Sequence, residues 1–372
     1  MIVSEGPLDI ALSVARITPK TQWIFLAATD SGGVTGLGEA TLNGREDDVL
    51  AAAERRLRGG ETGAPPDLPA AAFVSALDQA LHDLRARRSG TPLWRSFAAA
   101  AREPIPVYAN INRRTLDRTP EGFAESARVA KAAGHNAFKL APFDRVTAAT
   151  IRSGEARAGL AHGFECAAAV REIAGADARL MVDCHWRFDT PLAEEAIDRA
   201  AELGLHWVEC PIPETAENLP LLRRLRTRAN AKGVLLAGCE EAIGAAGFAP
   251  YLDAGAYDVL MPDVKYIGGF DEWFRLADHA ARAGTQLSPH NPSGPICHAM
   301  SLQISAVLPG FDRLEMQFDE SPLFDGLLRS PFAAIKNGYA ALPSGKGCGV
   351  EFSTAALDRH AVQRVDFPQV DI

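Results

Sequence analysis

Side chains able to do acid–base and metal chemistry recur along the middle of the chain, each at the end of a short apolar run. The clearest case is Leu180–Asp183, which is followed by Cys184 and His185. An apolar run of this length is typical of a buried strand in a parallel sheet. Asp183 and His185 then share one strand face, because strand side chains alternate with a period of two. The whole series is Lys139, Asp183 with His185, Glu209, Glu240, Asp263 with Lys265, His290 and Glu315.

The spacing of this series indicates a common site. From Asp183 onward, successive members are 23 to 31 residues apart, which is the length of one strand–helix unit. In an α/β barrel the carboxyl ends of the strands meet at one mouth and carry the active site. We therefore expect these side chains to converge there, although each one alone also fits an ordinary surface residue or a helix cap.

The residue types then suggest the chemistry. Asp183, Glu209 and Glu240 would form an all-oxygen cluster, which suits a hard divalent cation, Mg²⁺ before Mn²⁺. Without a cation, three such carboxylates would raise one another's pKa values. A cation with open positions binds a substrate carboxylate and stabilises the enediolate that forms when the α-proton leaves. His290 is the natural base for that proton, and Asp263 on the preceding strand can orient it.

The elements that must position these residues follow from the hydrophobic pattern. Over residues 104–328, apolar segments alternate with helical segments, which predicts a TIM-type barrel of eight strands. The segment 145–174 exceeds a usual barrel helix, so we expect an extra turn or loop there. The predicted strands are Ile105–Ala109, Ala137–Leu140, Leu180–Asp183, Trp207–Glu209, Val234–Ala237, Val259–Met261, Thr285–Ser288 and Arg313–Met316.

The two ends of the chain lack the regular alternation of strands and helices. Residues 1–103 predict a mixed α+β domain, with strands at 23–29 and 34–39 and a helix at 71–87. Residues 329–372 lose the alternation. Within them, the segments 338–343 and 349–352 look like short edge strands, which we expect to return to the N-terminal domain.

Composition excludes several classes of protein. The net charge of −9 argues against nucleic-acid binding. No apolar run approaches the roughly 20 residues that a membrane span needs. The six cysteines form no Cys-x-x-Cys pair, which favours a reducing cytoplasm over a disulfide framework. The first ten residues lack a basic region followed by an apolar core, so we expect no signal peptide.

Several motifs together resemble one family over nearly the whole chain. They are Val34-Thr-Gly-Leu-Gly-Glu-Ala40, Ser75-Ala-Leu-Asp-Gln-Ala-Leu-His-Asp-Leu84, Trp207-Val-Glu209, Ala237-Gly-Cys-Glu240, Met261-Pro-Asp-Val-Lys-Tyr-Ile-Gly-Gly269 and His290-Asn-Pro-Ser-Gly-Pro-Ile296. In these the chain resembles the mandelate racemase and muconate lactonising branch of the enolase superfamily. The resemblance implies a modified (β/α)7β barrel beneath an α+β capping domain built from both termini. It also implies a homo-oligomer.

The resemblance implies roles for the same series. Asp183, Glu209 and Glu240 match the Mg²⁺ ligands, and Asp263 with His290 matches the His–Asp dyad of the mandelate racemase subgroup. Glu315 resembles the acid that donates a hydrogen bond to the substrate carboxylate, a role that requires it to be protonated. We expect burial near other acids to favour that protonated state.

Two departures from the family pattern point to dehydration. The family's usual second-strand motif is Lys-x-Lys, whose second lysine is a base, but this chain has Lys139-Leu-Ala141. Lys139 is then left with a structural or electrostatic role near the carboxylates. Asp183-x-His185 is similar to galactonate dehydratase, in which that histidine protonates the leaving 3-hydroxyl. The resemblance therefore implies a Mg²⁺-dependent hydro-lyase that turns an aldonate-like acid sugar into a 2-keto-3-deoxy acid.

Other residues are weaker candidates. Lys265, Arg187, Asn110 and Asn112 stand at or beyond strand ends, where they would contact a carboxylate substrate, and Arg113, Arg114 and Tyr108 lie nearby. Cys210 and Cys239 replace more usual residues beside the metal ligands, and we expect both in the core. The capping domain of this family closes over the site, and we expect residues 7–22 to form its flexible loop.

Two alternative functions stay open. One is a racemase or epimerase of the same superfamily, with Lys265 or His185 as the second acid. The other is a homologue that binds metal but has no catalytic activity. Composition does not identify the substrate.

Overall fold

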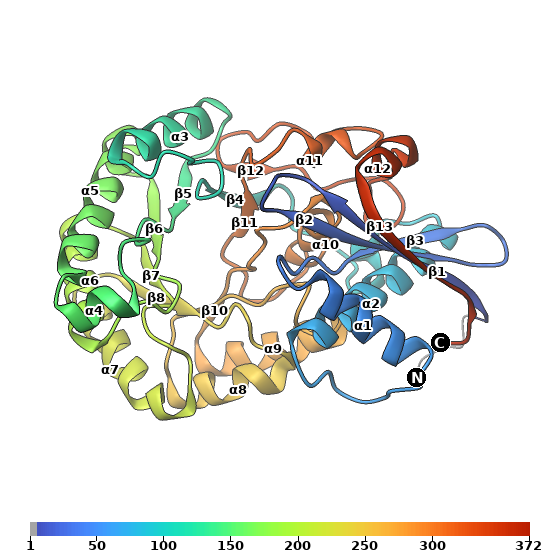
Figure 1. The fold of residues 1–372 in the computed structure, drawn as a ribbon, viewed down its shortest axis with the longest axis horizontal. Helices are drawn as coiled ribbons and strands as arrows, with labels where there is room; N and C mark the ends of the chain where they lie inside the picture. The colour runs from blue at the N-terminus through green and yellow to red at the C-terminus, as the bar shows by residue number, and fades with distance from the viewer. Residues whose placement is uncertain (1–5) are drawn as a thin grey trace.

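Two β-sheets organise the chain, and they lie at opposite ends of the molecule (Figure 1). The structure is a computed structural model that describes residues 6–372. Residues 1–5, which belong to the predicted capping domain and to the segment tested for a signal peptide, lie outside the described part. Among residues 6–372, no helix is long and apolar enough to cross a membrane. All six cysteines are free and buried.

The larger sheet is a barrel of eight parallel strands in the order β10-β9-β8-β7-β6-β5-β4-β11. Backbone hydrogen bonds close it between β10 and β11, from Leu287 N to Gly310 O at 2.9 Å and from Asp312 N to Leu287 O at 2.9 Å. The strands are β4 (Ile105–Asn110), β5 (Ala137–Leu140), β6 (Arg179–Asp183), β7 (Trp207–Glu209), β8 (Leu235–Gly238), β9 (Val259–Leu260), β10 (Gln286–Leu287) and β11 (Leu314–Gln317).

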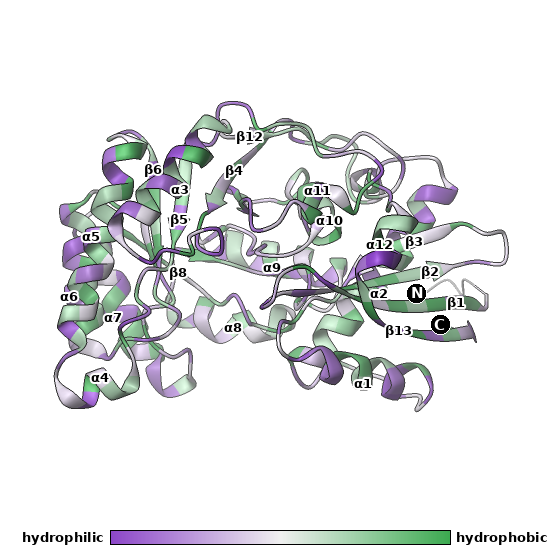
Figure 2. Cartoon of the chain, turned by 45° about the horizontal axis from the view of Figure 1, so that its top comes forward, coloured by the Kyte–Doolittle hydropathy of each residue, from purple (hydrophilic) through white to green (hydrophobic). Residues whose placement is uncertain are grey.

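Helices connect all successive barrel strands, so the predicted (β/α)7β fold is confirmed. Figure 2 shows that these helices carry both hydrophobic and hydrophilic residues, as expected of helices that pack one face against a sheet. The long segment 145–174 contains two helices, as the predicted extra turn implies. They are separated at Gly154, which caps α4 in a left-handed conformation with a φ of 80°. The helices are α3 (Pro120–Ala132), α4 (Ala148–Ser153), α5 (Ala156–Ala174), α6 (Thr190–Glu202), α7 (Leu219–Asn230), α8 (Gly244–Ala254), α9 (Phe270–Ala283) and α10 (Pro295–Ser305).

The smaller sheet forms the capping domain, in the antiparallel order β13-β1-β2-β3. Helices α1 and α2 cover it, and α2 packs so closely on β3 that a Cβ at Gly36 or Gly38 would overlap the carbonyl oxygens of Ala80 or Ala76. Its elements are β1 (Leu8–Arg16), β2 (Gln22–Thr29), β3 (Thr35–Glu39), α1 (Glu46–Leu57), α2 (Leu68–Arg88), α12 (Thr354–His360) and β13 (Ala361–Val370).

The prediction of a flexible loop at residues 7–22 is wrong, because β1 occupies most of that segment. Leu8, Ile10, Leu12 and Val14 are each 1% exposed or less. This period-two burial is the pattern of a strand with one face in the core. Only the short connection to β2, around residues 17–21, is left as a loop.

The prediction for the C-terminal tail is wrong for its first segment, because β12 (Tyr339–Ala340) pairs with β4 of the barrel and not with the capping sheet. The segment 349–352 forms no strand, and its one bridge joins Phe352 to Leu328. It does return to the capping domain, where Val350 O accepts from Arg87 of α2 at 2.8 Å and Phe352 packs on Phe25 of β2. The strand that does return to the capping domain is β13, which pairs with β1 and which the sequence analysis missed. Both ends of the described chain therefore lie at the capping end (Figure 1).

Candidate active site

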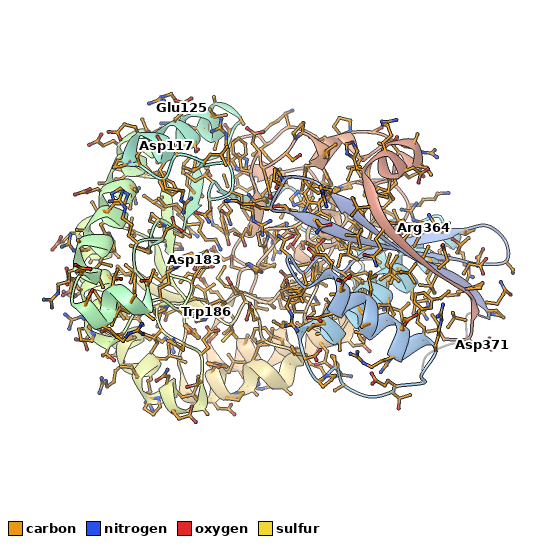
Figure 3. The ribbon with its side chains drawn as sticks, in the orientation of Figure 1. Asp117, Glu125, Asp183, Trp186, Arg364 and Asp371 are labelled. Atoms are coloured by element: carbon orange, nitrogen blue, oxygen red, sulfur yellow. The ribbon has the colours of Figure 1, made fainter. Side chains whose placement is uncertain are left out.

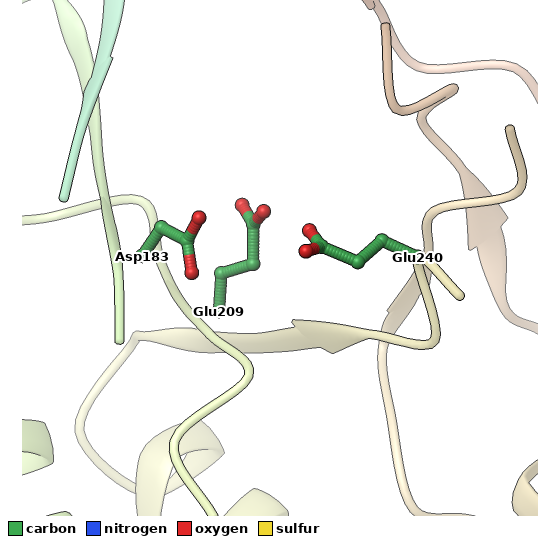
Figure 4. Close-up of side chains that lie close together, drawn as sticks. All are labelled: Asp183, Glu209 and Glu240. Atoms are coloured by element: carbon green, nitrogen blue, oxygen red, sulfur yellow. The ribbon is translucent and has the colours of Figure 1, made fainter. Parts of the chain in front are cut away.

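Three carboxylates converge at the mouth of the barrel, from the ends of three neighbouring strands. Asp183 ends β6, Glu209 ends β7, and Glu240 follows β8 by two residues. One ligand oxygen of each lies within 4.8 Å of the others. Figure 4 shows the three side chains pointing toward one another, and Figure 3 places Asp183 away from Asp117, just before α3, and from Glu125 on α3.

The electrostatics of this cluster fit a divalent cation. Burial and the charge of Asp183 raise the pKa of Glu240 well above its usual value. Burial also raises the pKa of Glu209 to about 8, although Lys139 opposes the rise. Glu240 Oε2 is buried without a hydrogen-bond partner, as expected of an oxygen that awaits a ligand. Hard oxygen donors with an orphaned acceptor are the donor set that Mg²⁺ prefers.

Lys139 lies beneath the cluster and binds two acids at once. Its Nζ is 2.6 Å from Glu209 Oε1 and 2.9 Å from Glu315 Oε1. The expectation that Glu315 is protonated is therefore wrong. Burial acts to raise the pKa of Glu315. The opposite effect of Lys139, His290 and the N–H of Asn291 is larger, so the pKa lies below its usual value. Glu315 is a carboxylate that accepts from Asn110 Nδ2 at 2.7 Å and from Asn291 N at 3.0 Å.

His290 and Asp263 form the predicted pair. His290 Nδ1 donates to Asp263 Oδ2 at 2.7 Å, and His290 Nε2 lies 3.5 Å from Glu240 Oε2. The nitrogen that faces the carboxylate cluster is therefore Nε2. Lys265 also donates to Asp263 Oδ2, and its Nζ donates to Ser293 Oγ at 2.5 Å. Burial opposes ionisation of Asp263, but Lys265 and His290 outweigh it and lower its pKa.

His185 faces the same space from the turn after β6, which ends at Asp183, so the prediction that the two residues share a strand face is wrong. Its backbone has a φ of 47°, a left-handed conformation that is uncommon for histidine. Its Nε2 is 2.8 Å from Asp183 Oδ2, and its side chain is 38% exposed. The charge of Asp183 raises the pKa of His185. Burial raises the pKa of Asp183, but His185 more than offsets this and lowers that pKa to about 2. Asp183 therefore departs from the upward shift expected of the carboxylates.

A cavity of about 230 Å³ joins these groups. Nine of its lining residues were candidates from the sequence: Asn110, Asn112, Arg113, Lys139, Asp183, His185, Glu240, Lys265 and His290. Thr41, Asn43, Tyr266, Pro292 and Ser293 complete the lining and were missed. Thr41 and Asn43 come from the capping domain just after the motif that ends at Ala40, which is the one sequence signal that could have found them.

Three weaker candidates do not line the cavity. Arg187 donates to Val146 O at 3.4 Å, and Arg114 binds Asp319 at 3.0 Å. Tyr108 is completely buried and packs edge-on against Trp207. In this structure the three side chains contact other parts of the protein, and their role in substrate binding stays a prediction. Cys210 and Cys239 are 0% and 1% exposed, as expected for the core.

The barrel matches one family by sequence. Residues 122–356 match the family described as enolase C-terminal domain-like. The chain belongs to the enolase superfamily. It is 31% identical over 304 residues to a D-gluconate dehydratase from Thermoproteus tenax, covering 80% of this chain but only 58% of that relative. It is also 31% identical over 294 residues to a D-galactarolactone cycloisomerase from Agrobacterium fabrum, covering 76% of this chain and 72% of the relative.

Other enolase-superfamily proteins share the sequence or the fold over more of the chain. A D-xylonate dehydratase from Haloferax volcanii is 24% identical and covers 92% of this chain and 86% of its own length. The crystal structure of a mandelate racemase/muconate lactonizing enzyme from Jannaschia sp. CCS1 has a TM-score of 0.81 at 23% identity, and it covers 96% of this chain and 98% of its own. This structural likeness supports the two-domain enolase fold.

Proposed function

We propose that this chain is a Mg²⁺-dependent dehydratase of an acid sugar, which converts an aldonate-like α,β-dihydroxy acid to a 2-keto-3-deoxy acid. One observation carries the proposal: His290 and His185 both line the cavity beside the carboxylate cluster. One histidine can act as the base and the other as the acid. Ala141, where the family places its second base, does not line the cavity. Relatives named dehydratases of gluconate, xylonate and galactonate support the same reaction class.

The residues of the chain divide the reaction into two proton transfers. Asp263 holds the Nδ1 proton of His290, which leaves Nε2 free to take the α-proton. The C–H electron pair becomes the double bond of an enediolate, and it then expels the 3-hydroxyl. His185 gives its proton to that hydroxyl as the C–O bond breaks, so water leaves. The resulting enol tautomerises to the 2-keto acid.

The carboxylates and Lys139 set the charge around these steps. Asp183, Glu209 and Glu240 would hold Mg²⁺, which supplies positive charge to the enediolate. Lys139 contributes a buried positive charge beneath the cluster, which lowers the pKa of Glu315 and opposes the rise in the pKa of Glu209. Asn110, which donates to Glu315, and Asn112 line the cavity and are suited to bind substrate hydroxyls.

Two substitutions test the roles of His290 as the base and His185 as the acid. We expect His290→Asn to abolish both exchange of the α-proton with solvent and dehydration, because it removes the base. We expect His185→Asn to lower dehydration by about 10²–10⁴-fold while exchange persists, because only the acid is lost. His279→Asn, on α9 and outside the cavity, is the matched control. Unchanged 2-keto acid formation in both site variants would refute the proposal.

A second candidate is an isomerisation of an α-substituted acid. Lys265 lines the cavity and binds the same Asp263 carboxylate as His290, and the Agrobacterium relative is a cycloisomerase. In this case deuterium from solvent would enter the α-carbon of an intact substrate, and Lys265→Met would remove that incorporation. Formation of a 2-keto-3-deoxy product excludes this alternative.

A further inference from the structure

Two metal ligands stand beside residues with strained backbone. Strand β8 ends at Gly238, and Cys239, which immediately precedes Glu240, has a φ of 69°. Cys210, which immediately follows Glu209, has a φ of 45°. Such left-handed conformations are costly in residues other than glycine and persist only when the surroundings impose them. Something near these two cysteines must therefore hold the turns.

Glu214 is that neighbour. It lies in the loop after β7, and its Oε1 accepts the backbone N–H of Cys239 at 2.7 Å and the hydroxyl of Tyr257 at 2.7 Å. The Cys210 thiol lies 3.8 Å from the same oxygen. The Cys239 N–H leaves the sheet where β8 ends, and a buried backbone donor requires a partner. Glu214 supplies it.

The space for this carboxylate depends on a glycine. A Cβ at Gly238 would overlap Glu214 Oε1 and would lie 2.6 Å from Tyr257 Cζ. Tyr251 Oη donates to the backbone carbonyl of Glu214 at 2.8 Å, which fixes the loop from its other side. In the turn after β6, Trp186 N donates to Cys210 O at 2.6 Å, and Figure 3 shows Trp186 near Asp183. The turns that follow β6, β7 and β8 are thus connected.

We propose that Glu214 is a positioning residue for the metal site: by binding the Cys239 N–H it holds the left-handed turn from which Glu240 projects toward Asp183 and Glu209. This assignment rests on the metal-binding part of the proposed function and not on the reaction. It also accounts for the tolerance of cysteine at position 239, where a φ of 69° favours glycine.

Metal affinity is the direct test, with Mn²⁺ as the probe and free Mn²⁺ measured by electron paramagnetic resonance on the full chain. We expect Glu214→Ala to weaken Mn²⁺ binding by about 10–100-fold, the usual effect of losing a residue that supports a metal ligand. Glu214→Gln keeps the acceptor oxygen and should stay within a few-fold of wild type. Circular dichroism and thermal unfolding show that the variants are folded.

A double-mutant cycle separates positioning from general stability. Cys239→Gly relieves the left-handed strain, so the turn depends less on Glu214. The loss in affinity caused by Glu214→Ala should therefore be several-fold smaller in the Cys239→Gly background. Equal losses in both backgrounds would overturn the proposal, as would a folded Glu214→Ala protein with wild-type affinity.

Two further results complete the test. If Glu214→Ala fails to fold, Tyr257→Phe, which removes one partner of the same oxygen, must still weaken Mn²⁺ binding, and wild-type affinity in that variant would overturn the proposal. If the wild-type chain binds no Mn²⁺, the metal site itself is wrong, a failure distinct from unaltered binding in the Glu214 variants.

Discussion

Lys139 shows how single residues set the charge of the site. A buried ammonium is costly unless it is paired, and Lys139 binds both Glu209 and Glu315. Five acids surround the mouth, namely Asp183, Glu209, Glu240, Asp263 and Glu315, and within residues 6–372 the buried lysines among them are Lys139 and Lys265. This excess of negative charge is a physical reason for a bound divalent cation.

A buried histidine makes the stability of the fold depend on pH. His298 lies on α10, 1% exposed, with Nδ1 3.0 Å from Asn291 Nδ2, so that nitrogen must be an unprotonated acceptor. Burial lowers the pKa of His298 to about 3, against about 6.5 in an unfolded chain. The unfolded state therefore binds a proton first as the pH falls. The stability present above pH 6.5 is lost progressively toward pH 3.

We predict that His298 alone makes the free energy of unfolding fall by about 2 kcal/mol between pH 7 and pH 5. Urea unfolding at both pH values checks it, with His298→Gln expected to show a smaller decrease than wild type. His279→Gln, on the exposed face of α9, is the control. An identical pH dependence in wild type and His298→Gln would contradict the assignment.

The sequence predicts the site residues that stand at strand ends but not their environment. Asp183, Glu209 and His290 are recognisable because each follows an apolar run at the spacing of one strand–helix unit. The ionised state of Glu315 depends on Lys139, which lies 176 residues earlier in the chain, and no local pattern carries that information. Thr41 was missed for the same reason, since its place over the cavity is set by domain packing.

At the scale of elements, one buried acid of the capping domain holds a barrel helix. Glu39, at the end of β3, accepts the N–H groups of Gly294 and Cys297 at 2.8 and 2.9 Å. These donors belong to the N-terminus of α10, where a negative charge is favourable. Because Ser293 precedes Gly294 and accepts from Lys265, Glu39 also fixes one wall of the cavity.

We predict that Glu39→Ala lowers the free energy of unfolding by about 2–4 kcal/mol, because two buried N–H groups lose their acceptor. Glu39→Gln should be intermediate, since its amide oxygen can still accept one of them. Urea unfolding monitored by fluorescence measures both. An alanine variant within about 0.5 kcal/mol of wild type, the range of ordinary surface changes, would show that Glu39 does not hold α10.

Elements differ in how far the sequence reveals them. The barrel strands were found because buried parallel strands are continuous apolar runs, and β5 and β7 were predicted to the residue. β13 was missed because it is an edge strand whose side chains are mostly exposed, with Phe367 as its single buried residue. Its position is determined by pairing with β1 across the whole length of the chain.

At the scale of the whole molecule, folding and metal binding are coupled. The fold brings together carboxylates from three strands, and a cation that binds only the folded state stabilises it by mass action. We predict that Mg²⁺ at 100 times its dissociation constant adds about 2.7 kcal/mol to the free energy of unfolding, and that chelation reverses this.

Thermal unfolding with Mg²⁺ and with a chelator measures this coupling, and Asp183→Asn, which loses one ligand charge, should show a much smaller shift. Because the ligands must be deprotonated, the shift should shrink as the pH falls. Equal melting temperatures with and without Mg²⁺ in wild type would contradict the assignment of a metal site.

The central claim is that the chain removes water from an acid sugar through an α-proton abstraction. The most direct measurement is NMR of wild-type protein with Mg²⁺ in D₂O, across a panel of aldonates. We predict that at least one aldonate yields a 2-keto-3-deoxy acid carrying one deuterium at carbon 3, where the enol takes up a solvent deuteron. Deuterium at the α-carbon of intact substrates without loss of water, or no reaction across the panel, would contradict the account.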